Sequence, residues 1–164
     1  MVAFLTSPLA APPLTYNDST APIAVGTRGI TSDGGEAIFI QAQSEISQYA
    51  AVVIQHNYKG RMATTTLITE GSGIGRRVGW AQASIGSGNY GWVQTMGKPI
   101  GRLSTDCADM VALYVTATAG EIDDAVVSIG LLEGVLAKTT ISNATAVTLL
   151  VATPCFVGNM AVQA

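Results

Sequence analysis

Short β-prone segments separated by turn signals recur along this chain from Glu36 onward, and this pattern constrains the fold more than any other feature. The segments are rich in β-branched and aromatic residues, and Gly, Asn, Asp or Ser residues separate them. No long helix alternates with them, so the sequence predicts an all-β, mainly antiparallel domain, either a small β-barrel or a β-sandwich. The predicted strands are Ala37–Gln41, Ala51–Gln55, Ala63–Ile68, Val78–Ala83, Gly91–Met96, Met110–Thr116, Ala125–Leu131 and Thr145–Ala152.

Three of these strands carry apolar residues at every second position. Successive side chains of a strand point to opposite faces, so each apolar set is expected to face a core. The sets are Val111, Leu113 and Val115; Val127, Ile129 and Leu131; and Val147, Leu149 and Val151. At most one short helix is predicted, over Ser44–Ala50, because Ile46, Tyr49 and Ala50 share one helical face.

The first 35 residues differ from the rest of the chain. They contain four prolines and two polar turn runs, Tyr16–Ser19 and Thr31–Gly35. Proline fixes φ and removes a hydrogen-bond donor, so this segment is unsuited to a central strand or a helix. We expect an extended N-terminal arm over residues 1–35 and a single β domain over residues 36–164, with the arm either a flexible tail or a segment that orders on a neighbouring subunit.

Composition indicates a protein that associates with others. Hydrophobic residues make up 48% of the chain and charged residues only 12%. A soluble monomer usually covers itself with more ionic groups, so we expect partners to cover part of the surface. No apolar run approaches the roughly 18–20 residues that a membrane-spanning helix needs.

The few charges are unevenly distributed around a net charge of −3. Lys59 to Arg102 contains six basic residues and one acid, whereas the chain from Leu103 onward contains six acids and one lysine. One interpretation is that these are solvated loop charges. The other is that opposite patches meet between subunits, where complementarity fixes the register.

Two glycine-rich stretches raise the question of phosphate binding. The first, GSGNYGWVQTMG (Gly86–Gly97), matches G-x-G-x-x-G, but a β-prone run follows it where a dinucleotide site needs a helix. We therefore interpret its glycines as turn residues that admit Trp92 into a paired strand. The second, Gly71–Arg77, lacks the Gly-Lys-Ser/Thr sequence that ends a P-loop. Its two arginines are too few basic residues to indicate a nucleic-acid-binding surface in an acidic protein.

Catalytic and metal-binding patterns find little support. His56 is the single histidine and is interpreted as a turn residue, so no multi-histidine metal site is expected. The acids Glu121, Asp123 and Asp124 lack the ligand order of a calcium loop. Without a secretion signal, Cys107 and Cys155 are expected to be free thiols. The sequence therefore predicts no enzyme, no cofactor and no metal.

The chain from Ile46 to Asp124 resembles the head decoration, or cement, proteins of tailed bacteriophages. The matching segments occur in the family's order and cover about half of the chain: ISQYAAVVI, ATT, VGWAQ, NYGWVQTMG and TATAGEIDD. The resemblance implies a β-rich structural protein that is made in the bacterial host cytoplasm and binds the major capsid protein on the outside of the head. It also implies a homotrimer, with no membrane or specific nucleic-acid partner.

Five residues are candidates for the subunit or capsid interface: Trp80, Tyr90, Trp92, Arg76 and Arg77. Trp, Tyr and Arg dominate interface hot spots, but the three aromatic residues are equally suited to filling the core. Two further function classes stay open at this point. One is another phage component, such as a head-fibre base or tail-tube subunit, and the other is a carbohydrate-binding or hydrolytic domain.

Overall fold

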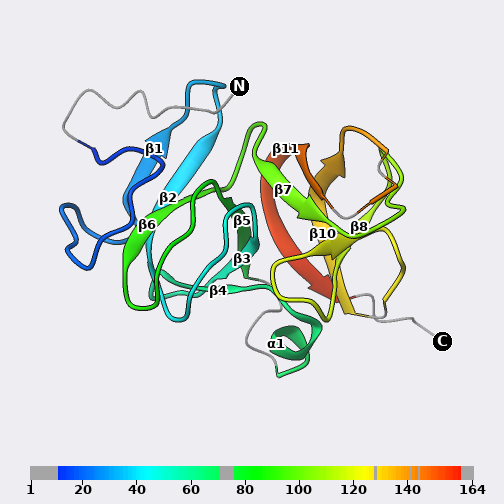
Figure 1. Cartoon of the computed structure of the whole chain (residues 1–164), viewed down its shortest axis with the longest axis horizontal. Coiled ribbons are helices and arrows are strands. Elements are labelled where there is room, and N and C mark those ends of the chain that lie inside the picture. Colours follow the sequence, from blue (N-terminus) through cyan, green and yellow to red (C-terminus); the bar gives the residue numbers. More distant parts are fainter. Residues whose placement is uncertain (1–10, 71–75, 128, 141, 144, 160–164) are drawn as a thin grey trace.

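The computed structural model describes residues 11–70, 76–127, 129–140, 142, 143 and 145–159, and for residues 145 and 152–159 it describes the strand but not the side chains. It confirms the all-β class with a small-barrel architecture. One short helix lies among the described residues (Figure 1). The elements are β1 (Arg28–Ile30), β2 (Glu36–Ala42), β3 (Ala51–Ile54), β4 (Lys59–Met62), α1 (Thr65–Thr69), β5 (Arg77–Ala81), β6 (Tyr90–Gln94), β7 (Ile100–Leu103), β8 (Leu113–Val115), β9 (Ile122–Asp123), β10 (Ile129–Ala137) and β11 (Thr145–Asn159).

The strands close into two small barrels. In the first barrel, pairing runs from β2 through β4, β3, β5 and β6 and returns to β2. In the second, it runs from β7 through β9, β8, β10 and β11 and returns to β7. The first half of the chain therefore builds one barrel and the second half the other.

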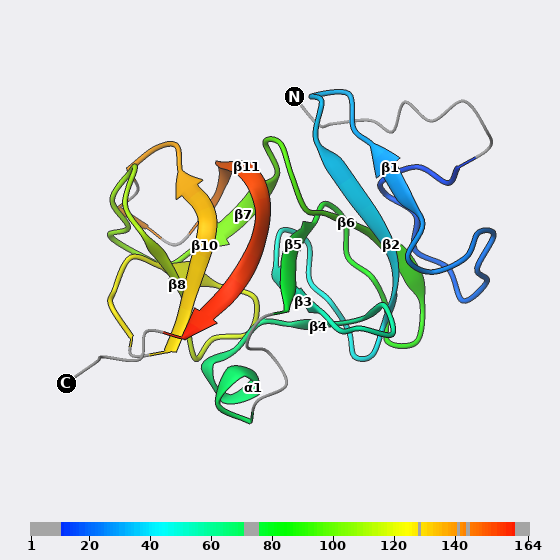
Figure 2. The same cartoon turned by 180° about the vertical axis from the view of Figure 1, so that it is seen from behind.

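The barrels lie side by side and share one strand pairing. The far end of β11 pairs with β5 of the first barrel, with Cys155 opposite Val78 and Phe156 opposite Arg77. Figures 1 and 2 show β11 running along the junction from both sides. A continuous backbone ladder thus joins the two halves.

Strands of the first barrel are buried on both faces, which explains their uninterrupted apolar runs. In β3, Val52 and Ile54 face the interior of the first barrel. The alternate residues Ala51 and Val53 pack into the core of the second barrel. The second barrel therefore covers one outer face of the first.

The described part of the N-terminal arm covers another outer face of the first barrel. Leu14 packs against Phe39 of β2 and Trp92 of β6. The indole Nε1 of Trp92 donates a hydrogen bond to the carbonyl oxygen of Pro12 at 2.8 Å. Apolar residues of the arm therefore contact the first barrel of their own chain, and the segment also includes the edge strand β1.

Local structure around Thr64 corrects two predictions. The predicted strand Ala63–Ile68 is largely the helix α1, because the Thr64 side chain accepts a hydrogen bond from the Leu67 backbone at 3.1 Å and caps it. The predicted helix Ser44–Ala50 is absent. Instead Ile46 forms an isolated bridge with Ile85.

The core face of β10 also differs from the prediction. Leu132, Val135 and Ala137 are buried, whereas the predicted set of Val127, Ile129 and Leu131 is only partly buried. Register shifts at Ile129/Leu131 and Glu133/Val135 move the apolar face. The prediction for Leu149 and Val151 is confirmed, since both are buried on β11. The short strands β1, β4, β7 and β9 were not predicted from the sequence.

Candidate functional site

The structure separates the five candidate interface residues into two groups. Trp80 and Trp92 are buried in the cores of this chain, at 0% and 1% exposure. Their indoles therefore offer almost no surface to a partner. Tyr90 is partly buried and stacks on Phe39, with ring centroids 6.2 Å apart.

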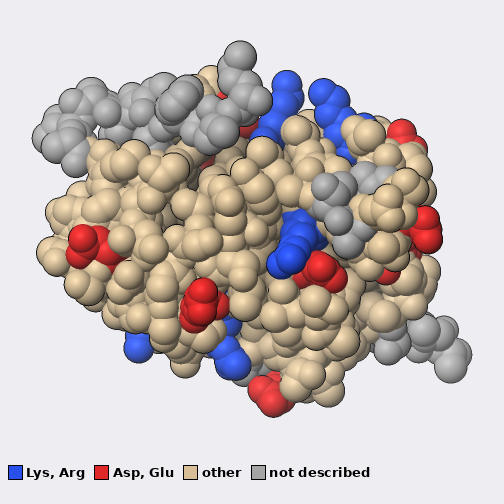
Figure 3. Space-filling model, viewed as in Figure 1, with Lys and Arg blue, Asp and Glu red and all other residues tan. Residues whose placement is uncertain are grey.

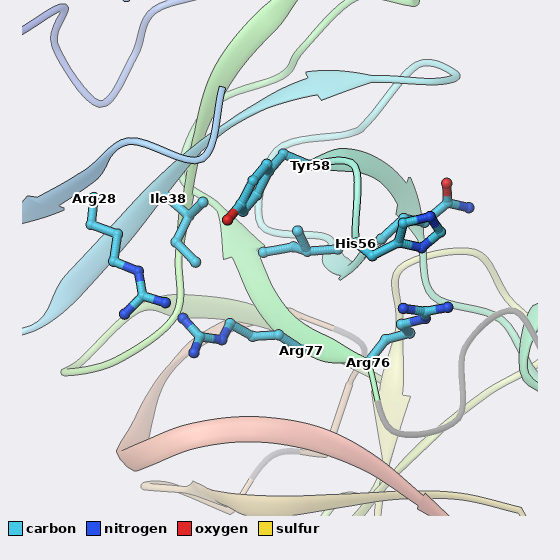
Figure 4. Close-up of a pocket in the computed structure, with 8 residues that line it drawn as sticks. Arg28, Ile38, His56, Tyr58, Arg76 and Arg77 are labelled. Atoms are coloured by element: carbon cyan, nitrogen blue, oxygen red, sulfur yellow. The ribbon is translucent and has the colours of Figure 1, made fainter. Parts of the chain in front are cut away.

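Arg76 and Arg77 lie together in a shallow pocket of about 240 Å³ beside the first barrel (Figure 4). Both side chains are partly buried. Segments far apart in the sequence supply the other walls, and the full lining is Arg28, Ile38, Ile54, Gln55, His56, Tyr58, Arg76 and Arg77. Three arginines and a histidine thus line one pocket, with Arg28 and Arg77 at one end and Arg76 and His56 at the other (Figure 4).

Strand pairing explains how these residues meet. In the β3–β5 ladder Arg77 lies opposite Ile54, and in the β1–β2 ladder Arg28 lies opposite Ile38. Arg76 immediately precedes β5, so both consecutive arginines line the pocket although neighbours within a strand point to opposite faces.

Glu36 holds two of the arginines. Its Oε1 accepts a hydrogen bond from Arg77 Nη1 at 3.1 Å, and its Oε2 lies 3.5 Å from Arg28 Nη1. The side chain of Arg28 is 56% exposed, against 21% for Arg77 and 24% for Glu36. Three arginines and one glutamate leave a formal charge of +2 when His56 is neutral. Among the described residues, neither Arg76 nor His56 forms an ion pair.

The turn between β3 and β4 places His56 and Tyr58 at the pocket. The Tyr58 backbone donates a hydrogen bond to Gln55 at 2.9 Å, and Tyr58 adopts the left-handed conformation, with φ of 58°. A non-glycine residue in this region costs about 1–3 kcal/mol and is frequent at functional sites. Gly26 of the arm leaves room for the Tyr58 ring, because a Cβ there would lie 2.5 Å from Tyr58 Cε2.

Arg76 and Arg77 were predicted from the sequence as interface residues, whereas Arg28, Glu36 and Tyr58 were not predicted as parts of a site. His56 does lie in a turn, as interpreted, yet it also lines the pocket. No spacing signal connects these residues, because β-ladders between separate segments bring them together. Only the strand register could have placed them.

Gly86–Gly97 forms the predicted turn and strand. Gly88 has a φ of 80°, and β6 starts at Tyr90. A strand thus follows the glycines, so no helix N-terminus is available for a pyrophosphate. Residues 71–75 of the second glycine-rich loop lie outside the described residues.

Among the described residues, one group has metal-ligating side chains close together. One ligand atom each from Cys107, Asp123 and Asp124 lies within 4.8 Å of the others. Burial, together with the negative charges of Asp124 and Asp123, raises the pKa of the Cys107 thiol to about 11. The Asp124 carboxylate already accepts a hydrogen bond from the Ala108 backbone at 2.9 Å. The group is therefore a protonated, free thiol beside acids that local backbone groups satisfy.

No helix in the described part of the chain is long and apolar enough to cross a membrane. No protein-family model matches this sequence, and no curated protein matches it either.

Proposed function

We propose that this chain is a structural virion protein: a decoration, or cement, protein that binds the major capsid protein on the outer surface of a tailed-bacteriophage head. The observation that carries the proposal is the sparse charge of the surface. Charged side chains are few and scattered over the face in Figure 3, and large apolar residues such as Ile30, Met110 and Val126 are exposed. A surface of this kind suits permanent assembly with partners. The resemblance of the segments from Ile46 to Asp124 to phage head decoration proteins suggests that this assembly is a phage capsid.

The proposed function is binding, without a catalytic step, a cofactor or a nucleic-acid partner. A subunit that binds the assembled shell but not free coat protein stabilises the shell by RT ln(1 + [L]/Kd) for each site, about 2.7 kcal/mol at a hundredfold excess over Kd. Many such sites together resist the pressure of the packaged genome. We assign a homotrimer to the bound form, with Tyr90, Arg76 and Arg77 as its contact candidates.

The test is size-exclusion chromatography with light scattering, followed by mixing the purified protein with undecorated heads. We expect trimers, saturable binding at a fixed ratio to the capsid protein, and heads that survive higher temperature. Electron microscopy of the mixture should place added density on the outer shell. Protein that ignores both procapsids and mature heads, or that stacks into rings like a tail tube, contradicts the proposal.

A further inference from the structure

We propose that the pocket lined by Arg28, Arg76, Arg77, His56 and Tyr58 binds a carboxylate-bearing segment of a partner protein. An acidic side chain is the part of the partner that enters the pocket. The inference does not depend on which assembly supplies that partner.

The charge of the pocket favours an anionic ligand. It keeps a formal charge of +2 after Glu36 is counted, although the whole chain carries −3. These cationic side chains repel one another, so the fold must hold them in place. The β1–β2 ladder positions Arg28 and the β3–β5 ladder positions Arg77. Figure 4 shows the guanidinium groups of Arg28 and Arg77 pointing toward each other across the pocket.

The arrangement already accommodates one carboxylate. Glu36 lies between Arg28 and Arg77, with contacts of 3.5 and 3.1 Å. A guanidinium has five N–H donors and pairs with carboxylates in a fork geometry. Arg76 has no ion pair with any other described residue, and its guanidinium lies beside His56, away from Arg28 and Arg77 (Figure 4), so its donors are available to a second carboxylate at that end of the pocket.

The apolar part of the lining favours a peptide over a simple anion or nucleic acid. Ile38 and Ile54 are almost fully buried, at 2% and 5% exposure, so the apolar surface that a ligand can reach is mainly that of Tyr58, which is 40% exposed. The exposed part of Tyr58 suits the aliphatic stem of Glu or the side chain next to it. A net charge of −3 repels a polyanion outside the pocket, and nucleic-acid binding relies on many backbone contacts that this small pocket does not offer.

The experiment measures binding of a short acetylated and amidated peptide with two glutamates among alanines (Ala-Glu-Ala-Glu-Ala) to the full chain by titration calorimetry at low salt. Inorganic phosphate and an oligothymidylate of equal charge are the competing probes. We expect the peptide to bind, and Arg76→Gln to weaken it about tenfold, as expected for loss of one charge-assisted contact. Arg102→Gln is the matched control, because Arg102 pairs with Glu121 at 3.6 Å on β7 and is not part of the pocket. It should leave the affinity unchanged.

Three outcomes overturn the inference: no peptide binding, tighter binding of phosphate or oligothymidylate, or equal weakening by Arg76→Gln and Arg102→Gln. Arg76 forms no ion pair with a described residue, so we expect Arg76→Gln to keep the wild-type unfolding midpoint, and measuring that midpoint separates a binding loss from misfolding. If wild-type protein binds heads but not the peptide, that result contradicts this inference and still supports the proposed function. If the protein binds the peptide but not heads, that result supports this inference and contradicts the proposed function.

Discussion

Trp92 Nε1 donates a hydrogen bond of 2.8 Å to the carbonyl oxygen of Pro12, although 80 residues separate the two. This bond ties the arm to β6 of the first barrel. Leu14 and Phe39 pack around the same indole, so the arm, β2 and β6 share one small apolar cluster. The arm is therefore part of the fold of its own chain from residue 11 onward.

Replacing Trp92 with Phe should loosen the arm. The change removes the donor and leaves the buried Pro12 carbonyl without its partner, at a cost of about 1–3 kcal/mol. Urea unfolding measures the loss, and limited proteolysis should show earlier cleavage within residues 11–27. Tyr16→Phe is the control, because the Tyr16 hydroxyl donates to Thr20 at an exposed position and its loss should cost under about 0.5 kcal/mol. Equal effects of the two variants would contradict a specific role for the indole bond.

The glycines of the GSGNYGWVQTMG stretch should differ in their tolerance of substitution. A Cβ at Gly91 would lie 2.7 Å from Ile85 Cδ1 and 2.9 Å from the Tyr16 carbonyl oxygen, so Gly91→Ala must displace the arm. We expect a loss of about 1–3 kcal/mol from overpacking. Gly88→Ala meets no atom within 4 Å and costs only the strain of its φ of 80°, about 1 kcal/mol. Proteolysis distinguishes them: Gly91→Ala should expose the arm and Gly88→Ala should not.

The sequence predicted the fold where burial follows a regular period and failed where the backbone breaks that period. Leu149 and Val151 lie on the core face of β11 as alternation predicts. In β10, Gly130 at φ of 99° and two register shifts move the core face to Leu132 and Val135. Bulges add a residue to one strand, so alternation counted from the strand start gives the wrong face beyond them.

A strand was predicted where the structure has the helix α1, because capping and packing outweigh the intrinsic β-propensity of the residues there. The run from Ala63 to Ile68 is rich in β-branched residues, yet the Thr64 side chain caps α1 and its buried residues Leu67 and Ile68 pack into the second core. A threonine cap favours the helix only where such packing stabilises it. The sequence alone does not show that packing.

The pocket was predictable only in part for a similar reason. Two consecutive arginines are visible in any sequence, and Arg76 and Arg77 were named from it. Their neighbours Arg28 and Glu36 come from about 40–50 residues earlier, and Glu36 pairs with Arg77 across 41 positions. Pairing between β-strands of distant segments depends on the whole topology, so no local spacing carries it.

Asp33 should make the protein less stable in acid. Burial raises the pKa of its carboxyl, but hydrogen bonds from the Thr31 hydroxyl and from the Lys98 and Gly35 backbones outweigh that effect, so the pKa lies below its ordinary value. A depressed folded pKa means that the ionised carboxylate stabilises the fold above the unfolded pKa of about 3.9 and that this contribution is lost as pH falls through the folded pKa. Asp33→Asn should therefore destabilise the fold at neutral pH, by less than about 1 kcal/mol because Asp33 is exposed and solvent screens its charge, with the gap to wild type closing below about pH 4.

Urea unfolding from pH 7 to pH 3 measures that gap. Asp18→Asn is the control, because Asp18 is exposed like Asp33 but accepts one backbone hydrogen bond, from Thr20 at 2.9 Å, where Asp33 accepts two, from Gly35 and Lys98. Its effect at neutral pH should be smaller than that of Asp33→Asn. A gap between wild type and Asp33→Asn that stays constant down to pH 3 would show that the carboxylate charge does not contribute.

Cys107 should be unreactive in the folded protein. Its side chain is fully buried, and burial with the nearby Asp124 and Asp123 charges raises the thiol pKa to about 11, so the thiolate that reacts is scarce at neutral pH. In a Cys155→Ser background, Ellman's reagent at pH 8 should label Cys107 at least about 100-fold more slowly than a free thiol. Denaturant should restore fast labelling because unfolding exposes the thiol and lowers its pKa to the ordinary value. Rapid labelling of the native protein would place Cys107 in an accessible, activated environment and contradict its assignment to the second core.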